Sequence, residues 1–209
     1  MASFPLFVDL KNKECLIIGA GDVALRKLEI LLRYDAQIKV IAPNICESIL
    51  ELEKDKKIRI EKRAYAKQDM EEVFLVIAAT SSAQTNVQIY EEAKRRNIPV
   101  NVVDEPSKCT FFFPSVIKRG DLSIGISTHG KFPALSKKLR KLLAEVVDEE
   151  YDEILNCLGD FRQLVRNKVP DQAQRELILK EVIEEFYAQQ GITAEALRAL
   201  LVKYERALL

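Results

Sequence analysis

Short apolar runs alternate with segments of helical spacing along the first half of the chain. The runs predict five strands, at residues 15–18, 37–42, 58–62, 74–79 and 100–103. The segments between them predict helices at 23–34, 45–53 and 85–96, with a brief helical turn near Asp69. The run at 73–79 has no polar position, which is typical of a strand buried on both faces of a parallel sheet. We therefore expect an α/β fold, a Rossmann-like doubly wound parallel sheet with helices on both faces.

The pattern changes after residue 103. Two further strands are expected at 111–117 and 122–127, joined by a hairpin-like turn at Lys118-Arg119-Gly120-Asp121. A helix is expected from Pro133 to about residue 149, because proline is favoured in the first helical turn. The remainder has a helical pattern, interrupted at Pro170 and Gly191. The chain is thus predicted to consist of a Rossmann-like domain at 1–113, a small mixed segment at 114–149 and a helical C-terminal domain at 150–209.

The first strand runs directly into a glycine turn and a helix. The turn reads Gly19-Ala20-Gly21-Asp22-Val23-Ala24, which fits the Gly-x-Gly-x-x-Ala pattern of dinucleotide-binding folds. Gly19 allows a sharp bend, Gly21 lets a pyrophosphate approach the backbone, and Ala24 allows close helix–strand packing. The free amides at the helix N-terminus then face the anion. The turn predicts NAD(P) binding; the alternative is a tight strand–helix turn without a ligand.

Three other candidates follow strands of the sheet, where ligands of parallel sheets bind. Pro43 and Asn44 follow the second strand, Thr80 the fourth and Asp104 the fifth. Asn44 stands where an acidic residue usually binds the adenosine ribose, and no arginine stands there for a 2′-phosphate, which favours NAD over NADP. Asp104 is the candidate general base, although Asp-Glu-Pro is also an ordinary turn.

The loop before Pro133 offers further polar chemistry. Ser127 and the single histidine, His129, are candidate catalytic residues, because imidazole moves protons near neutral pH. Without a catalytic role, Ser127 would only end a strand and His129 would be an ordinary surface histidine. Lys118, Arg119 and Lys131 come from loops that we expect to line one cleft, which suits a ligand with several carboxylates. The nearby cations at 137–141 are expected to be the solvated face of a helix.

Composition narrows the function classes. The 209 residues carry 32 basic and 32 acidic side chains, so nonspecific nucleic-acid binding is not expected. Four dispersed cysteines and one histidine make a zinc site improbable, and no metal ligands are proposed. Cys15, inside the first strand, is expected to be a buried apolar residue. We see no signal peptide and no apolar run that would span a membrane, and expect a cytoplasmic protein.

Several motifs, in order, resemble one family: the precorrin-2 dehydrogenases, alone or as the N-terminal part of siroheme synthase. The resemblance runs from about residue 4 to residue 143. Besides the glycine turn, it is carried by these segments: Phe4-Pro5-Leu6-Phe7-Val8-Asp9-Leu10, Val76-Ile77-Ala78-Ala79-Thr80, Val100-Asn101-Val102-Val103-Asp104, Phe113-Pro114-Ser115-Val116 and Ile126-Ser127-Thr128-His129-Gly130-Lys131.

The resemblance implies a reaction and a site. Precorrin-2, a tetrapyrrole with eight carboxylates, loses a hydride to NAD+ and a proton, giving sirohydrochlorin. Asp104 corresponds to the family's acting aspartate, and Ser127 to a serine at its active-site cleft. Dinucleotide contacts carry over to Asp22, Val23, Pro43 and Asn44. The family forms homodimers through its middle segment. We recognise no methyltransferase pattern in these 209 residues and do not expect them to make precorrin-2.

The chain also departs from the family pattern. A loop that commonly reads Thr-Gly-Gly-Lys-Ser-Pro has His129 for a glycine and Phe132 for the serine. His129 is then an added proton carrier, a metal ligand or neutral variation. Three hypotheses follow: an NAD-dependent precorrin-2 dehydrogenase, a bifunctional enzyme that also inserts Fe2+ or Co2+ into sirohydrochlorin, or an NAD-responsive regulatory module with the helical tail as its partner surface.

Overall fold

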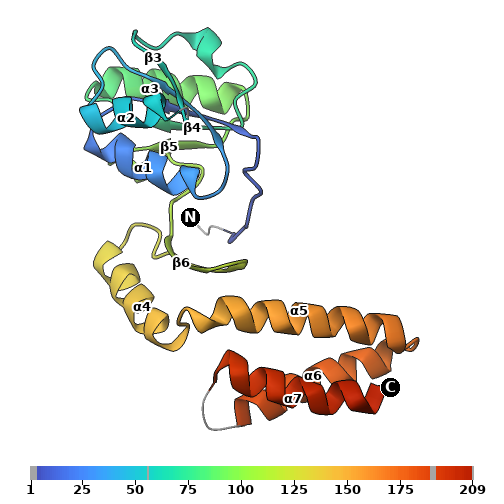
Figure 1. Cartoon of the computed structure of the whole chain (residues 1–209). Coiled ribbons are helices and arrows are strands. Elements are labelled where there is room, and N and C mark those ends of the chain that lie inside the picture. The colour runs from blue at the N-terminus through green and yellow to red at the C-terminus, as the bar shows by residue number, and fades with distance from the viewer. Residues whose placement is uncertain (1–3, 56, 189–191, 209) are drawn as a thin grey trace. The chain divides into compact units, whose positions relative to one another are not determined.

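The first half of the chain forms a five-stranded parallel sheet, in the computed structural model shown in Figure 1. The strands are β1 (Glu14–Ile18), β2 (Gln37–Ile41), β3 (Arg59–Glu61), β4 (Leu75–Ala78) and β5 (Val100–Val102). Their order in the sheet is β3-β2-β1-β4-β5, so the winding reverses between β1 and β4. This strand order confirms the predicted Rossmann-like fold. Both faces of such short apolar strands are buried because helices cover each side of the sheet.

Helices cover the two faces of the sheet separately. On one face, α1 (Asp22–Leu32) and α2 (Glu47–Lys54) pack against Cys15, Ile17 and other inward residues of β1, β2 and β4. On the other, α3 (Ala83–Arg95) and the short 3-10 turn η1 (Lys67–Met70) pack against Leu16, Ile18 and their neighbours. The alternate residues of β1 therefore serve two cores.

Cys15 behaves as the sequence predicts. Its side chain is fully buried in the core beside α1. Burial raises the pKa of the Cys15 thiol to about 12, because a thiolate would lose its hydration there. The residue is a neutral, apolar part of the core.

The start of α3 differs from the sequence prediction. The helix begins at Ala83, two residues before the expected start at residue 85. Ser82 is the reason, because its hydroxyl oxygen accepts a hydrogen bond from the Thr85 backbone N–H at 3.2 Å. This N-cap satisfies one of the free amides of the first turn.

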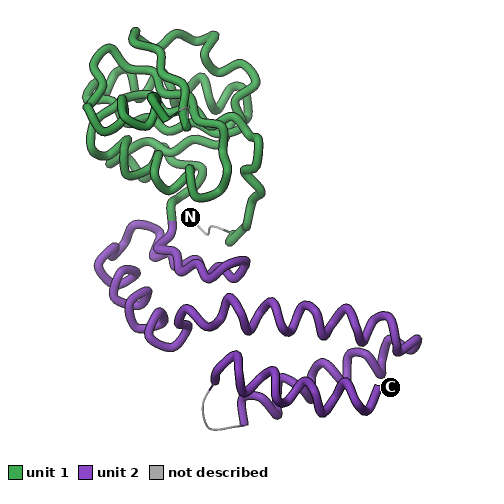
Figure 2. Tube along the Cα trace, viewed as in Figure 1, with its two compact units in different colours: residues 1–113 green, residues 114–209 purple. Residues whose placement is uncertain are grey.

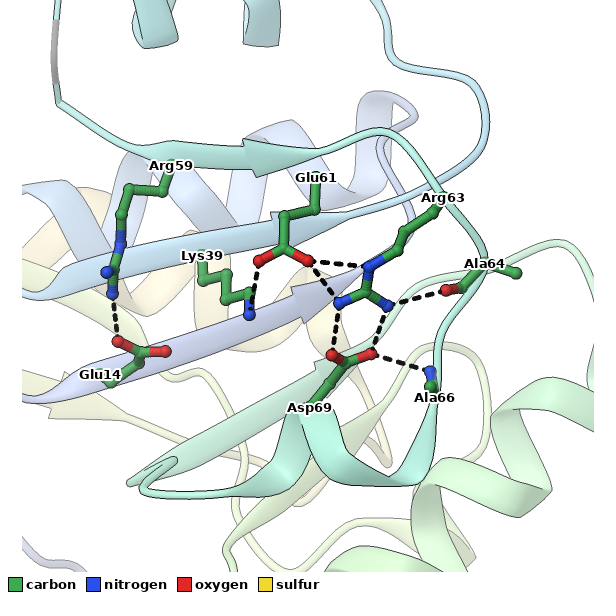
Figure 3. Close-up of polar contacts among 8 residues, drawn as sticks. All are labelled: Glu14, Lys39, Arg59, Glu61, Arg63, Ala64, Ala66 and Asp69. Carbon is green, nitrogen blue, oxygen red and sulfur yellow. Dashed lines mark hydrogen bonds and ion pairs between the residues drawn. The ribbon is translucent and has the colours of Figure 1, made fainter.

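The edge strand β3 is held by charged side chains (Figure 3). Arg63, just beyond β3, donates to both carboxylate oxygens of Asp69, at 2.8 Å to Oδ2, and from Nε to Glu61 at 2.8 Å. Lys39 of β2 pairs with the same Glu61 at 2.7 Å. Only 7% of Asp69 is exposed, and its Oδ2 also accepts the Ala66 N–H at 2.8 Å. These ion pairs therefore stabilise a strand that, with three residues, makes few backbone hydrogen bonds.

The structure describes residues 4–55, 57–188 and 192–208, and it divides into two compact units, Met1–Phe113 and Pro114–Leu209 (Figure 2). The second unit opens with an antiparallel hairpin, β6 (Ser115–Arg119) and β7 (Leu122–Ile126). Four helices follow: α4 (Pro133–Val146), α5 (Glu150–Lys168), α6 (Gln172–Ala188) and α7 (Ala194–Leu208). The predicted division of this part at residue 149 stays a prediction.

Two boundaries in this part of the chain were predicted wrongly. The strand expected from residue 111 begins only at Ser115. Pro114 has no N–H to donate, and the Phe111 carbonyl instead accepts a 3.0 Å hydrogen bond from Asn101 Nδ2. The helix expected to reach residue 149 ends at Val146, and α5 starts at Glu150, whose N–H bonds to the Asp148 carboxylate at 3.0 Å.

The last three helices share a core of their own. Phe161, Val165, Phe186 and Leu197 are almost completely buried in it. The Glu150 carboxylate accepts the Ala194 N–H at 2.8 Å, so a residue of α5 holds the start of α7. Pro170 separates α5 from α6 as predicted. The break expected at Gly191 lies outside the described residues.

The Arg63–Asp69 pair predicts a measurable contribution to stability. Burial by itself raises the pKa of Asp69, but the hydrogen bonds from Arg63 and the Ala66 N–H outweigh it, and the net pKa lies below the usual value. At pH 7, Asp69→Asn should lower the free energy of unfolding by about 2 kcal/mol. Asp55→Asn, which breaks an exposed pair with Lys57, should cost less than about 0.5 kcal/mol. Urea denaturation measures both.

The same pair sets a direction for acid unfolding. A carboxyl whose folded-state pKa is depressed stabilises the fold above its unfolded pKa, and this stabilisation disappears as the pH falls through the folded pKa. The loss should therefore occur below about pH 4. Asp69→Asn should flatten this part of the stability curve; identical acid slopes for variant and wild type would contradict the assignment.

Candidate functional site

The glycine turn sits where the winding of the sheet reverses. Gly19 follows β1 with φ of +106°, a conformation that L side chains rarely adopt. A Cβ at this position would lie 2.2 Å from the Ala79 carbonyl oxygen and 3.0 Å from the Thr80 nitrogen. The chain segments that follow β1 and β4 therefore touch here, and only glycine fits between them. In open parallel sheets this reversal point is where the ligand crevice forms.

Gly21 differs from Gly19, because its missing side chain leaves open space and no strained backbone is involved. It is the N-cap of α1, and its backbone is extended, so other residues would adopt it without strain. It is exposed, and a Cβ there would have no atom within 4 Å. The space above the first amides of α1 is thus open for an anion, and a side chain would enter it. These residues fit the pyrophosphate of a dinucleotide.

The turn is connected to the segment after β2. Gly19 N donates to the Ile41 carbonyl at 2.9 Å, and Cys46 N donates to the Ala20 carbonyl at 3.1 Å. Pro43 and Asn44 lie between these contacts and are exposed. The predicted dinucleotide contacts after β2 are therefore held beside the glycine turn by backbone hydrogen bonds. Asp22 and Val23, at the start of α1, are exposed as well.

Thr80, the predicted contact after β4, is held by a residue that the sequence analysis missed. Asn86 of α3 donates from Nδ2 to the Thr80 carbonyl at 3.1 Å. Its Oδ1 lies 2.8 Å from Thr80 Oγ1 and accepts the Thr80 N–H at 3.3 Å. Asn86 fixes the shape of this strand end. Its only sequence signal is an asparagine one turn inside a helix, where a polar side chain ordinarily points to water.

Asp104 stands exposed at the turn after β5. Its φ is +61°, in the left-handed region, and Glu105 N donates back to the Val102 carbonyl at 3.3 Å. A non-glycine residue in this region is uncommon, and aspartate tolerates it better than most. The sequence places Asp104 at the carboxyl edge of the sheet, and the structure puts it there in a tight turn with its carboxylate open to solvent.

The remaining predicted residues belong to the second unit. Ser127 and His129 are exposed in the loop before α4, where Ser127 Oγ accepts the His129 N–H at 3.1 Å. His129 has φ of +52°, so it occupies a backbone conformation that suits glycine. Lys131 follows in the same loop and is exposed.

The two cations of the hairpin have protein partners. Lys118 Nζ donates to the Gly120 carbonyl at 2.7 Å. Arg119 Nε donates to the Asp148 carbonyl at 2.9 Å, and its guanidinium lies 3.3 Å from the Glu149 carboxylate. Arg119 therefore ties the hairpin to the segment between α4 and α5. Its predicted role in binding substrate stays a prediction.

In the described ranges 4–55, 57–188 and 192–208, no three His, Cys, Asp or Glu residues come together as metal ligands would. No helix in those ranges combines the length and apolar character needed to cross a bilayer.

The chain matches two family models. One, described as "Putative NAD(P)-binding", covers residues 6–115, and one described as "Sirohaem biosynthesis protein central" covers residues 119–145. Siroheme synthase of Pseudoalteromonas translucida is 38% identical over 175 residues, which are 84% of this chain and 37% of that protein. Siroheme synthase of Psychrobacter cryohalolentis is 40% identical over 184 residues, 88% of this chain and 35% of that protein.

A solved structure is similar to this chain along nearly its whole length. The protein named "SirC, precorrin-2 dehydrogenase" aligns with a TM-score of 0.76 and 26% identity, covering 97% of this chain and all of the other. The chain belongs to the siroheme synthase and precorrin-2 dehydrogenase family. The resemblance found in the sequence is confirmed, and so is the prediction of a nicotinamide dinucleotide as the cofactor. This family member spans little more than a third of the two curated siroheme synthases.

The two glycines of the turn give a paired prediction. Gly19→Ala should destabilise the fold by about 3 kcal/mol, because its methyl group would overlap the Ala79 carbonyl at an unfavourable φ. Gly21→Ala should unfold at the wild-type temperature yet bind NAD+ at least about tenfold more weakly, because its methyl group occupies the open space over α1. Thermal unfolding and calorimetric NAD+ titration separate the two. Wild-type affinity in Gly21→Ala would rule out pyrophosphate binding at this turn.

Proposed function

We propose that this protein oxidises precorrin-2 to sirohydrochlorin with NAD+. The observation that carries the proposal is the match along the whole chain to a protein named precorrin-2 dehydrogenase, combined with a glycine turn that fits a dinucleotide. The similarity to siroheme synthases supports the same proposal. In the proposed reaction, the substrate gives up a hydride and a proton, and the bound NAD+ supplies the hydride acceptor.

The dinucleotide is assigned to the carboxyl edge of the sheet. Gly19 shapes the turn, while Gly21, Asp22 and Val23 meet the pyrophosphate at the start of α1. Pro43 and Asn44 take the adenosine ribose, and Thr80, braced by Asn86, lies along the adjacent strand end.

NAD is favoured over NADP by the charges after β2 and β3. Asn44 is neutral, and Arg63, the arginine that follows β3, is already engaged by Asp69 and Glu61. A 2′-phosphate is ordinarily accommodated by an arginine, and here the carboxylates compete for its guanidinium.

Asp104 is assigned the role of general base. Its carboxylate is exposed at a strand end, so it can accept the substrate proton without first breaking an internal ion pair. Ser127 and His129 are assigned to the same reaction as polar groups that orient the substrate or carry its proton onward. Lys118, Arg119 and Lys131 are assigned to the substrate carboxylates, Arg119 through guanidinium N–H groups other than the Nε–H that bonds to the Asp148 carbonyl.

The name of the solved relative favours oxidation over the regulatory module considered from the sequence. Insertion of Fe2+ or Co2+ into the product is a second reaction to be tested separately, by adding the metal to sirohydrochlorin in the absence of NAD+. We further place the protein in the cytoplasm, because Cys15, Cys46, Cys109 and Cys157 are all free thiols, which suit a reducing compartment.

We also propose that the protein is a homodimer associating through α4. Five apolar residues recur along this helix at helical spacing, and each is more than a third exposed: Leu135, Leu139, Leu142, Leu143 and Val146. Lys137, Arg140 and Lys141 lie on the other side of the helix, and Lys138 flanks the apolar stripe. An exposed apolar stripe of this length is typical of an association surface.

The catalytic assignment predicts a specific loss. Asp104→Asn should lower kcat for NADH formation from precorrin-2 by at least about 100-fold, with the affinity for NAD+ unchanged. Asp35→Asn is the matched control, because Asp35 is also exposed and left-handed, with φ of +54°, but precedes β2 at the opposite edge of the sheet. Absorbance of NADH and of the oxidised macrocycle measures both variants. Wild-type turnover in Asp104→Asn would show that Asp104 is not the general base.

The dimer assignment predicts a change of mass. Light scattering should give wild-type protein the molar mass of two chains. The double variant Leu139→Lys, Val146→Lys should have the mass of one chain, because buried charges without partners oppose association. Leu177→Lys is the control, because Leu177 is 56% exposed on α6 of the same unit. A double variant that stays dimeric would place the interface elsewhere.

A further inference from the structure

Lys27 is a half-buried cation on α1, in the first unit. Its ammonium nitrogen lies 4.2 Å from the ring centroid of Phe113, close enough for a cation–π contact. Phe113 is itself fixed against the core that holds α1, beside Phe111 at a centroid distance of 5.4 Å. The ring therefore presents a firm surface on which the ammonium rests, and this position is set by packing.

The ammonium has no anionic partner among the residues that the structure describes. Other partly buried cations do: Lys39 and Arg63 pair with Glu61, and Arg96 pairs with Glu92. Burial lowers the pKa of Lys27, and the neighbouring Cys109 raises it only partly. A cation that has lost part of its hydration without gaining a carboxylate is an incomplete ion pair.

The surroundings place this ammonium near the proposed catalytic turn. The Phe113 ring on which the ammonium rests lies beside Phe111, whose carbonyl accepts a 3.0 Å hydrogen bond from Asn101 of β5. Cys109 is close enough to Lys27 to affect the pKa of the ammonium, and its sulfur lies 3.2 Å from the Val102 carbonyl oxygen and 3.4 Å from the Glu105 carbonyl oxygen, on either side of Asp104. Lys27 therefore lies near the segment that follows β5, to which the proposed hydride and proton transfer is assigned.

We propose that Lys27 binds a carboxylate of the tetrapyrrole substrate, at a subsite formed by its ammonium and the ring of Phe113. The inference rests on the proposed function, because that function supplies a ligand with many carboxylates. A substrate carboxylate completes the ion pair in a partly dehydrated place, where the attraction exceeds that on an open surface. The Phe113 ring adds an apolar contact for the macrocycle edge.

The pyrophosphate of the cofactor is a poorer occupant. It is assigned to the amides at the start of α1, and Lys27 lies six residues beyond Gly21, roughly 9 Å along the helix axis. The Lys27 ammonium also lies over the ring of Phe113, in the segment that follows β5. The lysine is thus available to the second ligand.

The experiment compares Lys27→Met with Lys13→Met. Lys13 is the matched control, because its ammonium also lies over a ring, 5.7 Å from the centroid of Phe74, but next to the first residue of β1 at the amino edge. Each full-length variant is titrated with uroporphyrin, a porphyrin with eight carboxylates, by fluorescence, and with NAD+ by calorimetry. KM and kcat for precorrin-2 are measured alongside.

Lys27→Met should bind uroporphyrin roughly tenfold more weakly, with a smaller dependence on salt, and should raise KM more than it lowers kcat. Its affinity for NAD+ should match wild type. Lys13→Met should match wild type in every measurement, and Lys27→Arg should restore most of the porphyrin affinity.

Charge is separated from the ring by Phe113→Leu, which keeps the ammonium and removes the ring. Phe113→Leu should keep the wild-type salt dependence of porphyrin binding, because the ion pair remains. Wild-type porphyrin affinity and salt dependence in Lys27→Met would overturn the proposal. A fall in NAD+ affinity without a fall in porphyrin affinity would overturn it too. Wild-type protein that binds uroporphyrin through Lys27 but does not oxidise precorrin-2 would refute the proposed function and leave this subsite standing.

Discussion

The architecture depends on one close approach, between the chain after β1 and the chain after β4. The missing side chain at Gly19 lets these two segments touch, and the sheet reverses its winding at the same place. From there α1 leaves toward one face and α3 toward the other, the arrangement in which parallel sheets bind ligands at the carboxyl edge. Gly21, the first amides of α1, Thr80 and the Asp104 turn all derive their positions from this edge.

Most polar side chains near that edge serve to hold backbone in place. Asn86 satisfies three groups of Thr80, and Asn101 holds the Phe111 carbonyl. Arg63 and Asp69 fix the segment beyond β3 (Figure 3). Two groups assigned to the substrate are not engaged in this way: the Asp104 carboxylate is exposed, and the Lys27 ammonium has no anion within the described residues. A rigid frame with a few uncommitted charges is suited to binding two ligands in a fixed relation.

The strands and the glycine turn were predictable because each follows from a local pattern. A run such as 73–79 has no polar residue for solvent to face, and Gly19 precedes a helix by three residues. Boundaries were harder to predict. The start of α3 depends on the Ser82 cap, the end of α4 on the turn at Asp148, and the late start of β6 on Pro114 and Asn101. Each depends on one hydrogen bond or on one missing donor, which periodicity does not reveal.

The sequence by itself determined the doubly wound sheet, the dinucleotide turn and the family, because these rest on residues that are neighbours along the chain. The tertiary structure decided which charges are already engaged. From the sequence, Arg119 is a cation available to a ligand, but in the structure it bonds to the carbonyl of Asp148, 29 residues away. Lys27 has the sequence pattern of an ordinary helix cation, but its ammonium lies over the ring of Phe113. Electrostatic partners are chosen by distance in space, and only the folded chain sets that distance.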